Sequence, residues 1–164
     1  MKEKQFIVLK TMVEATSKMD VNTLAKKVDL SPNQTILQIQ DLAKEGYLQR
    51  VGGGYGITDK GKAALKANMQ INAAKGFHFY NGIDQPTDST ALSIEQFYKI
   101  LKQISIDSIE FHLNREDFEN WLRNVCEDSK LANEFGSIKA AGSKGEVLRA
   151  ELLKALDLKY SIRE

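Results

Sequence analysis

Three amide side chains lie close together within residues 31–45, a stretch with the apolar periodicity of an amphipathic helix. Asn33, Gln34 and Gln38 fall outside its apolar stripe. Asparagine and glutamine can form two hydrogen bonds at once with adenine, through N6 and N7 in the major groove of DNA. If this helix lies in the major groove, these three amides are expected to contact DNA bases. Thr35 is expected to contact a phosphate or a thymine methyl group.

The ends of this helix have clear local signals. Ser31 begins it and forms a capping box with Gln34, Pro32 occupies its first position, and Gly46 ends it. Ser31 is also expected among the residues that contact DNA. The apolar stripe expected to face the core consists of Ile36, Ile39, Leu42 and Ala43. Leu37 is expected to be exposed, and the alternatives for its contact are a thymine methyl group, a partner protein or the preceding helix.

The flanking segments predict the elements that position this helix. Helices are expected over residues 3–17 and 21–28, with a connection at 18–20 and Asp20 as the cap of the second helix. Two short extended runs around three consecutive glycines predict a β-hairpin, and a further helix follows over 59–74. A boundary near Lys75-Gly76 would separate a first domain, 1–74, from a second, 75–164.

Basic residues surround the predicted helix and hairpin and are expected to contact phosphates. They are Lys26, Lys27, Lys44, Arg50, Lys60 and Lys62. Gly53 would let the hairpin backbone approach the duplex, and Tyr55 would lie along the sugar-phosphate edge. Residues 1–70 hold 11 Lys and Arg against 7 Asp and Glu, a net charge of +4, whereas residues 71–164 hold 12 against 15, a net −3. This split favours a polyanion as the partner of the first domain.

Three helices followed by a hairpin resemble the winged helix-turn-helix domain of the MarR- and PadR-like regulators of archaea and bacteria. The residues that carry the resemblance are Leu24-Ala25, Ser31, Thr35-Ile36, Leu42, Glu45-Gly46-Tyr47-Leu48 and Ile57-Thr58-Asp59-x-Gly61. The match covers about residues 3–72. It implies a transcriptional regulator that places the helix 31–45 in the major groove of double-stranded DNA and contacts the backbone with the wing 48–58.

The second half is expected to be α-helical, with a strand-like or irregular entry and a polar loop before its first helix. Its pattern F-x-F-x-x-G, then H-x4-D-F-x-x-W, is similar to a small helical domain of unknown function found mainly in archaeal proteins. That resemblance implies a fold but no activity. The whole chain is thus expected to be mainly α with a small β-hairpin. The expected roles of the second domain are dimerisation, effector sensing or partner binding, with helices 59–74 and 145–159 as candidates for a homodimer contact.

Residues capable of catalysis or metal binding are few. Cys126 lies in an apolar helical setting outside any nucleophile motif and is expected to be buried. His112 is expected to hydrogen-bond Asp117, which would cap the next helix, although a metal site formed by these two with His78 is an alternative. Trp121 is expected in an aromatic core with Phe97, Phe111 and Phe118. We expect neither enzymatic activity nor a cofactor.

The single cysteine excludes an intramolecular disulfide, and no signal peptide or membrane-spanning run occurs in the sequence, so a cytoplasmic protein is expected. A second hypothesis for the function is a protein-docking adaptor that uses the winged helix without binding DNA. A third is a sensor of a metal or small molecule, which is compatible with DNA binding.

Overall fold

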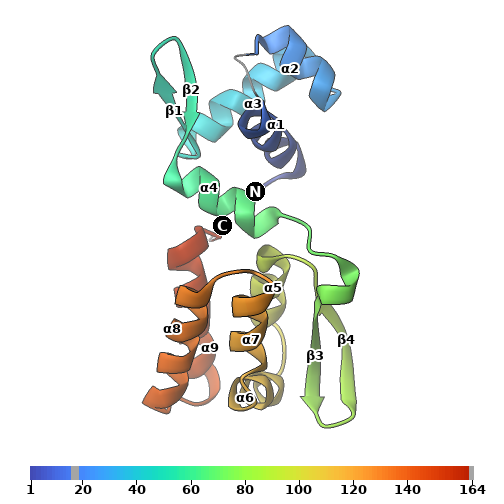
Figure 1. Ribbon diagram of the computed structural model, residues 1–164, viewed down its shortest axis with the longest axis vertical. Coiled ribbons are helices and arrows are strands. Elements are labelled where there is room, and N and C mark those ends of the chain that lie inside the picture. The colour runs from blue at the N-terminus through green and yellow to red at the C-terminus, as the bar shows by residue number, and fades with distance from the viewer. Residues whose placement is uncertain (16–18, 163–164) are drawn as a thin grey trace. The chain divides into compact units, whose positions relative to one another are not determined.

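The computed structural model describes residues 1–15 and 19–162, and Figure 1 shows its elements. The chain is divided into two compact units, Met1–Asn68 and Met69–Glu164, a division a few residues before the expected one. Each unit combines helices with one two-stranded antiparallel hairpin, so the chain is mainly helical. The expected end of the first helix at residues 16–17, and Lys18 of the following connection, lie outside the described residues.

The first unit has three helices that contact one another in pairs: α1 (Glu3–Glu14), α2 (Val21–Val28) and α3 (Pro32–Lys44). A hairpin of β1 (Leu48–Val51) and β2 (Gly54–Ile57) follows directly after α3, and α4 (Asp59–Asn68) completes the unit (Figure 1). Its core consists of Val8, Leu9, Leu24, Val28, Ile39, Leu42, Tyr47, Leu48 and Ala64.

Local capping explains where α2 and α3 begin. The Asp20 carboxylate accepts a hydrogen bond from the Thr23 N–H at 2.7 Å, and the Ser31 hydroxyl accepts one from the Gln34 N–H at 3.1 Å. The Gln34 side chain accepts in turn from the Ser31 N–H at 3.3 Å, which confirms the predicted capping box. Asp29 ends α2 in the left-handed conformation, so only Asp29, Leu30 and Ser31 separate the two helices.

Two predictions about this part of the chain were wrong. Ile36 was expected to face the core, but it is 38% exposed, because the buried positions of α3 are Thr35, Ile39 and Leu42 and Ile36 lies beyond the edge of that face. The helix predicted over 59–74 ends at Asn68. Ile71 donates its N–H to the carbonyl of Leu92 at 2.7 Å instead of continuing a helix, and the short 3-10 helix η1 (Ala73–Lys75) follows.

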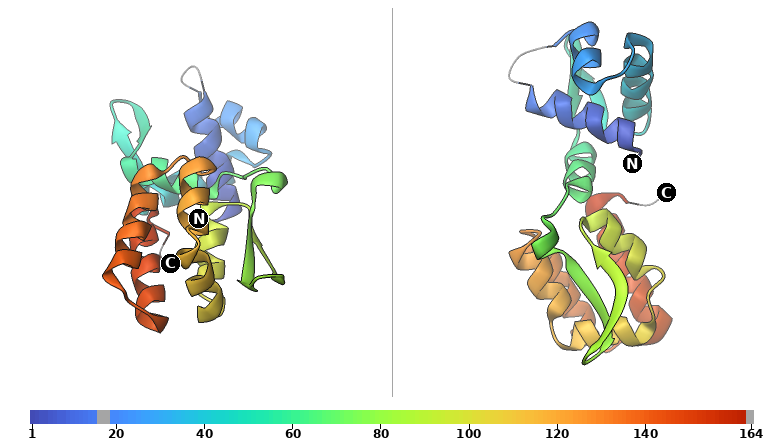
Figure 2. Two further views of the ribbon diagram at one scale, coloured as in Figure 1. Left: turned by 60° about the horizontal axis from the view of Figure 1, so that its bottom comes forward. Right: turned by 90° about the vertical axis from the view of Figure 1, so that its right-hand side faces the viewer.

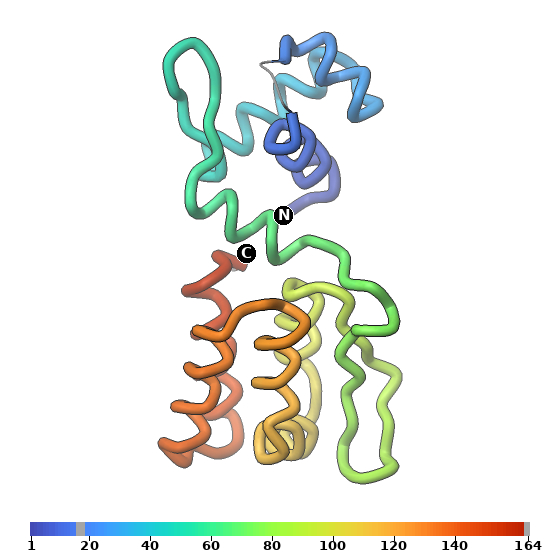
Figure 3. The backbone as a smooth tube through the Cα atoms, viewed as in Figure 1, coloured from blue at the N-terminus to red at the C-terminus, as the bar shows by residue number. Residues whose placement is uncertain are grey.

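The second unit contains a hairpin that was not predicted, formed by β3 (Phe77–Gly82) and β4 (Gln85–Ala91). It lies as a layer over the helices of this unit, in contact with α5 and α6 (Figure 2). The helices are α5 (Ile94–Leu101), α6 (Ile106–Asn114), α7 (Asp117–Asn124), α8 (Ser129–Ala141) and α9 (Gly145–Tyr160). Successive helices among α7, α8 and α9 run antiparallel to each other, as the backbone path in Figure 3 shows.

An aromatic cluster forms the centre of this unit. Phe97 stacks on Trp121 with ring centroids 5.1 Å apart, and Phe118 meets the ring of Phe97 edge to face at 5.3 Å. The indole N–H of Trp121 donates to the Lys75 carbonyl at 2.9 Å, so the polar atom of this buried ring is satisfied. The expected core placement of these rings and of Cys126 is confirmed, whereas Phe111 is only half-buried.

A buried carboxylate joins the start of α8 to the end of α9. Asp128 is 4% exposed and accepts hydrogen bonds from the Leu131 N–H at 3.0 Å, the Lys159 ammonium at 3.3 Å and the Tyr160 hydroxyl. Burial raises the pKa of Asp128, but the hydrogen bonds from Tyr160 and Leu131 outweigh it and hold this pKa below its usual range. Asp128 is therefore ionised in the folded chain at neutral pH, and it is the N-cap of α8.

Within the described ranges, we find no helix that has both the length and the apolar character needed to cross a membrane.

Candidate nucleic-acid interface

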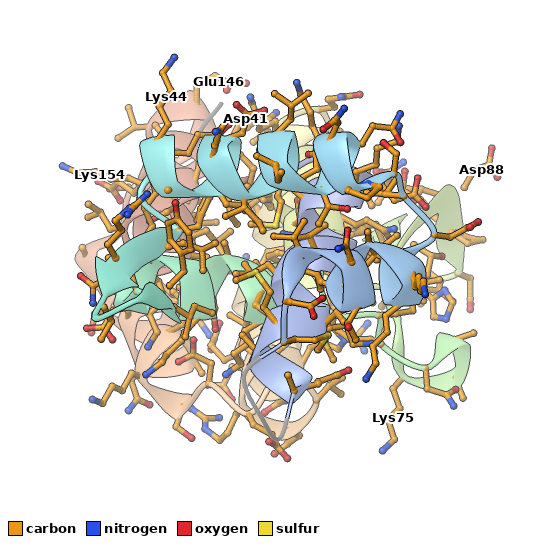
Figure 4. All side chains as sticks on the ribbon, turned by 90° about the horizontal axis from the view of Figure 1, so that it is seen from above. Asp41, Lys44, Lys75, Asp88, Glu146 and Lys154 are labelled. Carbon is orange, nitrogen blue, oxygen red and sulfur yellow. The ribbon has the colours of Figure 1, made fainter. Side chains whose placement is uncertain are left out.

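The exposed side of α3 can be identified from the residues of this helix that are buried in the core. Thr35, Ile39 and Leu42 are buried, so the residues half a helical turn away face outward. These are Asn33, Leu37, Gln40 and Lys44, which are spaced by four, three and four residues and are all exposed. We call these four residues the outer face of α3. Figure 4 shows Lys44 and its neighbour Asp41 projecting from this helix.

The three predicted amides do not form one group. Asn33 lies on the outer face, whereas the Gln34 side chain bonds the Ser31 N–H as part of the cap, and Gln38 is half-buried on the side of the helix. Gln40 lies on the outer face but was not among the predicted contact residues. Counting the helical phase from the buried residues would have found it, because the helix turns by 100° per residue.

Thr35 is the clearest correction among the predicted contact residues. It is fully buried, and its hydroxyl donates to the carbonyl of Ser31 at 2.9 Å within the first turn of α3. A side chain in this position cannot reach a phosphate or a base. The prediction assigned the wrong helical phase: Thr35 was expected on the surface and Ile36 in the core, and the structure has the reverse.

The basic residues fall into two groups, those that bond no other described residue and those that already have a partner in the first unit. Four exposed lysines form no hydrogen bond or ion pair with any described residue: Lys26, Lys27, Lys44 and Lys62. Lys60, by contrast, donates to the Glu45 carbonyl at 2.7 Å and lies 4.9 Å from the centre of the Tyr47 ring. The structure thus gives Lys60 a role at the end of α3, where the sequence predicted a phosphate contact.

Arg50 and Tyr55 are partners across the β1–β2 hairpin, and the guanidinium carbon lies 5.5 Å from the ring centre. Stacking of this kind limits the rotamers of the arginine and leaves its fork of N–H donors exposed. Gly52, with a φ of 59°, and Gly53 form the two-residue turn at the tip, where the backbone is exposed. The hairpin therefore presents an arginine on one strand and bare backbone at its end.

The base of the hairpin is fixed to the end of α3 by Thr58. Its hydroxyl donates to the Gly46 carbonyl at 2.6 Å and accepts from the Gly61 N–H at 3.0 Å, while its own N–H donates to the Tyr47 carbonyl at 3.1 Å. Gly61 is buried because α4 passes directly against the backbone at Tyr47. Two of the segments that carry the resemblance in the sequence, residues 45–48 and 57–61, are thus joined by hydrogen bonds in the structure.

A Gly61→Ala variant is expected to lower the free energy of unfolding of the first unit by about 1–3 kcal/mol. The added Cβ would lie 2.2 Å from the Tyr47 oxygen and 2.7 Å from Cγ1 of Ile57, so the backbone must shift. Circular dichroism on heating would measure the loss, and hydrogen exchange would assign it to this unit. Gly136→Ala is the control, because a Cβ at that position in α8 has nothing within 4 Å and alanine favours a helix. Equal destabilisation by both substitutions would contradict the explanation.

A groove of about 620 Å³ opens in the second unit, along β3 and the helices α6 and α7. Arg115, Asp84 and Asp117 contribute its charges, so the groove has no excess of positive charge. Arg115 lies over the ring of Phe111 at 4.9 Å, and its Nε is 3.6 Å from the Asp117 carboxylate. This groove therefore lacks the electrostatic character of a polyanion site.

His112 lies buried at the edge of this groove with both ring nitrogens engaged. Nδ1 lies 2.9 Å from the Asp117 carboxylate, as predicted, and Nε2 accepts the Tyr80 N–H at 2.7 Å. This arrangement requires a neutral ring with the proton on Nδ1. Burial lowers the pKa of His112, although the bond to Asp117 opposes the effect. His112 therefore has no nitrogen left for a metal.

The expected cap of α7 and the alternative metal site both differ from the structure. Glu116, in the left-handed conformation, is the N-cap of α7, and Asp117 bonds His112 from the first turn instead of capping. His78 points to Thr90, with Nδ1 2.9 Å from the hydroxyl oxygen. Across the part of the chain that the structure describes, no three His, Cys, Asp or Glu residues are grouped as metal ligands.

Comparison with known proteins places most of the chain in one family. Residues 56–157 match a family described as "Family of unknown function (DUF5752)", and the match begins within β2 and continues through most of α9. No curated protein matches the chain, and no solved structure does. Since the match covers more than half of the sequence, the chain belongs to this family of unknown function.

Proposed function

We propose that this protein is a DNA-binding transcriptional regulator whose first unit is a winged helix-turn-helix of the MarR- and PadR-like type. The observation that carries the proposal is the outer face of α3. It combines two exposed amides with a lysine, beside a hairpin that presents an arginine and an exposed glycine turn. In this proposal α3 enters the major groove and the hairpin, as the wing, contacts the backbone.

The arrangement of the first unit supports this proposal. Three helices contact one another in pairs, a three-residue turn joins α2 to α3, and the hairpin follows the third helix directly. Helix-turn-helix motifs use short turns of this length. The four available lysines, with Arg50, would supply phosphate contacts, which position a protein on DNA and make its affinity fall with salt.

A homodimer forms part of the proposal, because one such module reads only a short half-site. The second unit is the proposed source of the dimer contact, of effector binding or of a further protein contact. In α9, Val147 and Leu158 are largely exposed and lie eleven residues apart on one side of the helix. These two side chains are available for a partner subunit.

One observation favours a second candidate function, a protein-docking adaptor. Ile36 and Leu37 are adjacent and both exposed on α3. Such a pair would suit an apolar partner surface as well as a base edge. The two candidates differ in whether the affinity of the first unit depends on phosphate charge.

Fluorescence anisotropy with the full chain would test the proposal. We expect tighter binding to the DNA upstream of its own gene than to scrambled DNA, and a steep loss of affinity across about 50–300 mM salt. Asn33→Ala is expected to reduce binding to the upstream DNA by about 1–3 kcal/mol. Gln103→Ala, an exposed amide in the second unit, should leave the affinity unchanged. If neither DNA binds at the lowest salt, the regulator is rejected and the adaptor becomes the better hypothesis.

A further inference from the structure

Leu37 lies in the middle of the outer face of α3 and is 56% exposed. Four residues before it is Asn33 and three residues after it is Gln40, so an amide stands one turn away on each side. Ile36, which is 38% exposed, extends the apolar surface on one edge. An apolar centre between two amides is thus the chemical pattern of this face.

The floor of the major groove offers few apolar groups. The thymine methyl group is the one that an aliphatic side chain can contact, and adenine in the same pair presents N6 and N7 to an amide. Guanine is instead recognised mainly by arginine or lysine, and the outer face has no cation before Lys44 at its end. The residue types of this face therefore match A·T pairs better than G·C pairs.

We infer that the outer face of α3 reads A·T base pairs, with Leu37 packed on a thymine methyl group and Asn33 and Gln40 bonded to adenines. This inference rests on the proposed function. Asp41 flanks the same face, where its carboxylate would repel phosphates and could accept a hydrogen bond from the amine of an adenine or a cytosine, but not from guanine or thymine.

The inference is tested in two steps with the full chain. Selection from a pool of random duplexes should first give a site with A·T pairs at its centre. Each thymine of that site is then replaced by deoxyuridine, which removes the methyl group and keeps the base-pairing pattern. At one or two positions per half-site, wild-type affinity should fall by about fourfold, the effect of one buried methyl-sized group. Leu37→Ala should bind the thymine site more weakly and show no further loss with deoxyuridine.

Ile83→Ala is the control, because Ile83 is also an exposed apolar residue, 74% accessible, in the hairpin region of the second unit. This variant should retain the full deoxyuridine effect. The inference is overturned if the selected site is G·C-rich, or if Leu37→Ala loses as much affinity on deoxyuridine replacement as the wild type does. Either of these two results would leave the proposal of DNA binding standing. Failure to select any site would reject the proposed function itself, so the two failures are distinguishable.

Discussion

A Lys44→Glu, Arg50→Glu double variant should bind DNA about a hundredfold more weakly than the wild-type chain at low salt. The substitutions remove one cation at the end of α3 and one on the hairpin, and they place two anions against the phosphates. Each lost phosphate contact also lowers the slope of log K against log salt by about 0.9. We therefore expect a slope smaller by about two. Titrations at several salt concentrations measure both quantities.

The control for this prediction has the same net charge. Lys130→Glu combined with Lys154→Glu changes two exposed lysines of the second unit, in α8 and α9. It should reduce affinity only slightly, because neither lysine belongs to the unit that is proposed to contact DNA. Equal losses in the two double variants would show that total charge, and not the proposed surface, determines binding.

An Asp128→Ala variant should lose about 3 kcal/mol of stability in the second unit. Removing the carboxylate deprives α8 of its N-cap, which costs about 0.5–2 kcal/mol. It also leaves the buried hydroxyl of Tyr160 without its acceptor, at a cost of about 1–3 kcal/mol. The sequence contains one tryptophan, Trp121, so its fluorescence in urea follows the unfolding of this unit alone. Asp88→Ala, in which an exposed aspartate of β4 is replaced, should have no measurable effect.

The stability lost in the Asp128→Ala variant should also depend on pH. The pKa of Asp128 is lower in the folded chain than in the unfolded chain, so its charge stabilises the fold above the ordinary aspartate pKa of about 3.9. This contribution is lost as the pH falls through the lowered folded value. The stability difference between wild type and Asp128→Ala should therefore be constant near neutral pH and narrow below about pH 4. A difference that stays constant down to pH 2 would contradict the assignment.

Local signals in the sequence were sufficient to predict those elements whose structure depends mainly on residues close to one another in the chain. The cap of α3 was predicted from Ser31 and Gln34, and the β1–β2 hairpin from its glycines, because both depend on neighbours in the chain. The aromatic core and the bond between His112 and Asp117 also followed from residue types and short spacing. The cap, the hairpin turn and the His112–Asp117 bond require no knowledge of distant contacts, whereas the aromatic core was predicted from residue types alone.

The errors occurred where distant contacts decide the structure. In β4 the segment Gln-Pro-Thr-Asp-Ser-Thr has no apolar alternation, because only Ala91 at the end of this strand is buried; the strand is extended through its pairing with β3. The end of α4 depends on a hydrogen bond from Ile71 to Leu92, and the second partner of His112 is the Tyr80 N–H, 32 residues away. The error at Thr35 and Ile36 has a different cause. Counting 100° per residue from Ile39 and Leu42 would have placed Thr35 in the core and Ile36 outside it.

The attachment of the hairpin at Thr58 has a consequence for the entropy of binding. The strands are paired from Leu48 and Ile57 to Val51 and Gly54, so only Gly52 and Gly53 lie beyond the paired register. Ordering the backbone of one residue costs about 1–2 kcal/mol, and glycine loses the most freedom. A wing whose base is already held would have to order only those two residues against a duplex, which limits the cost to about 2–4 kcal/mol. Most of the contact energy of the hairpin would then remain available as affinity.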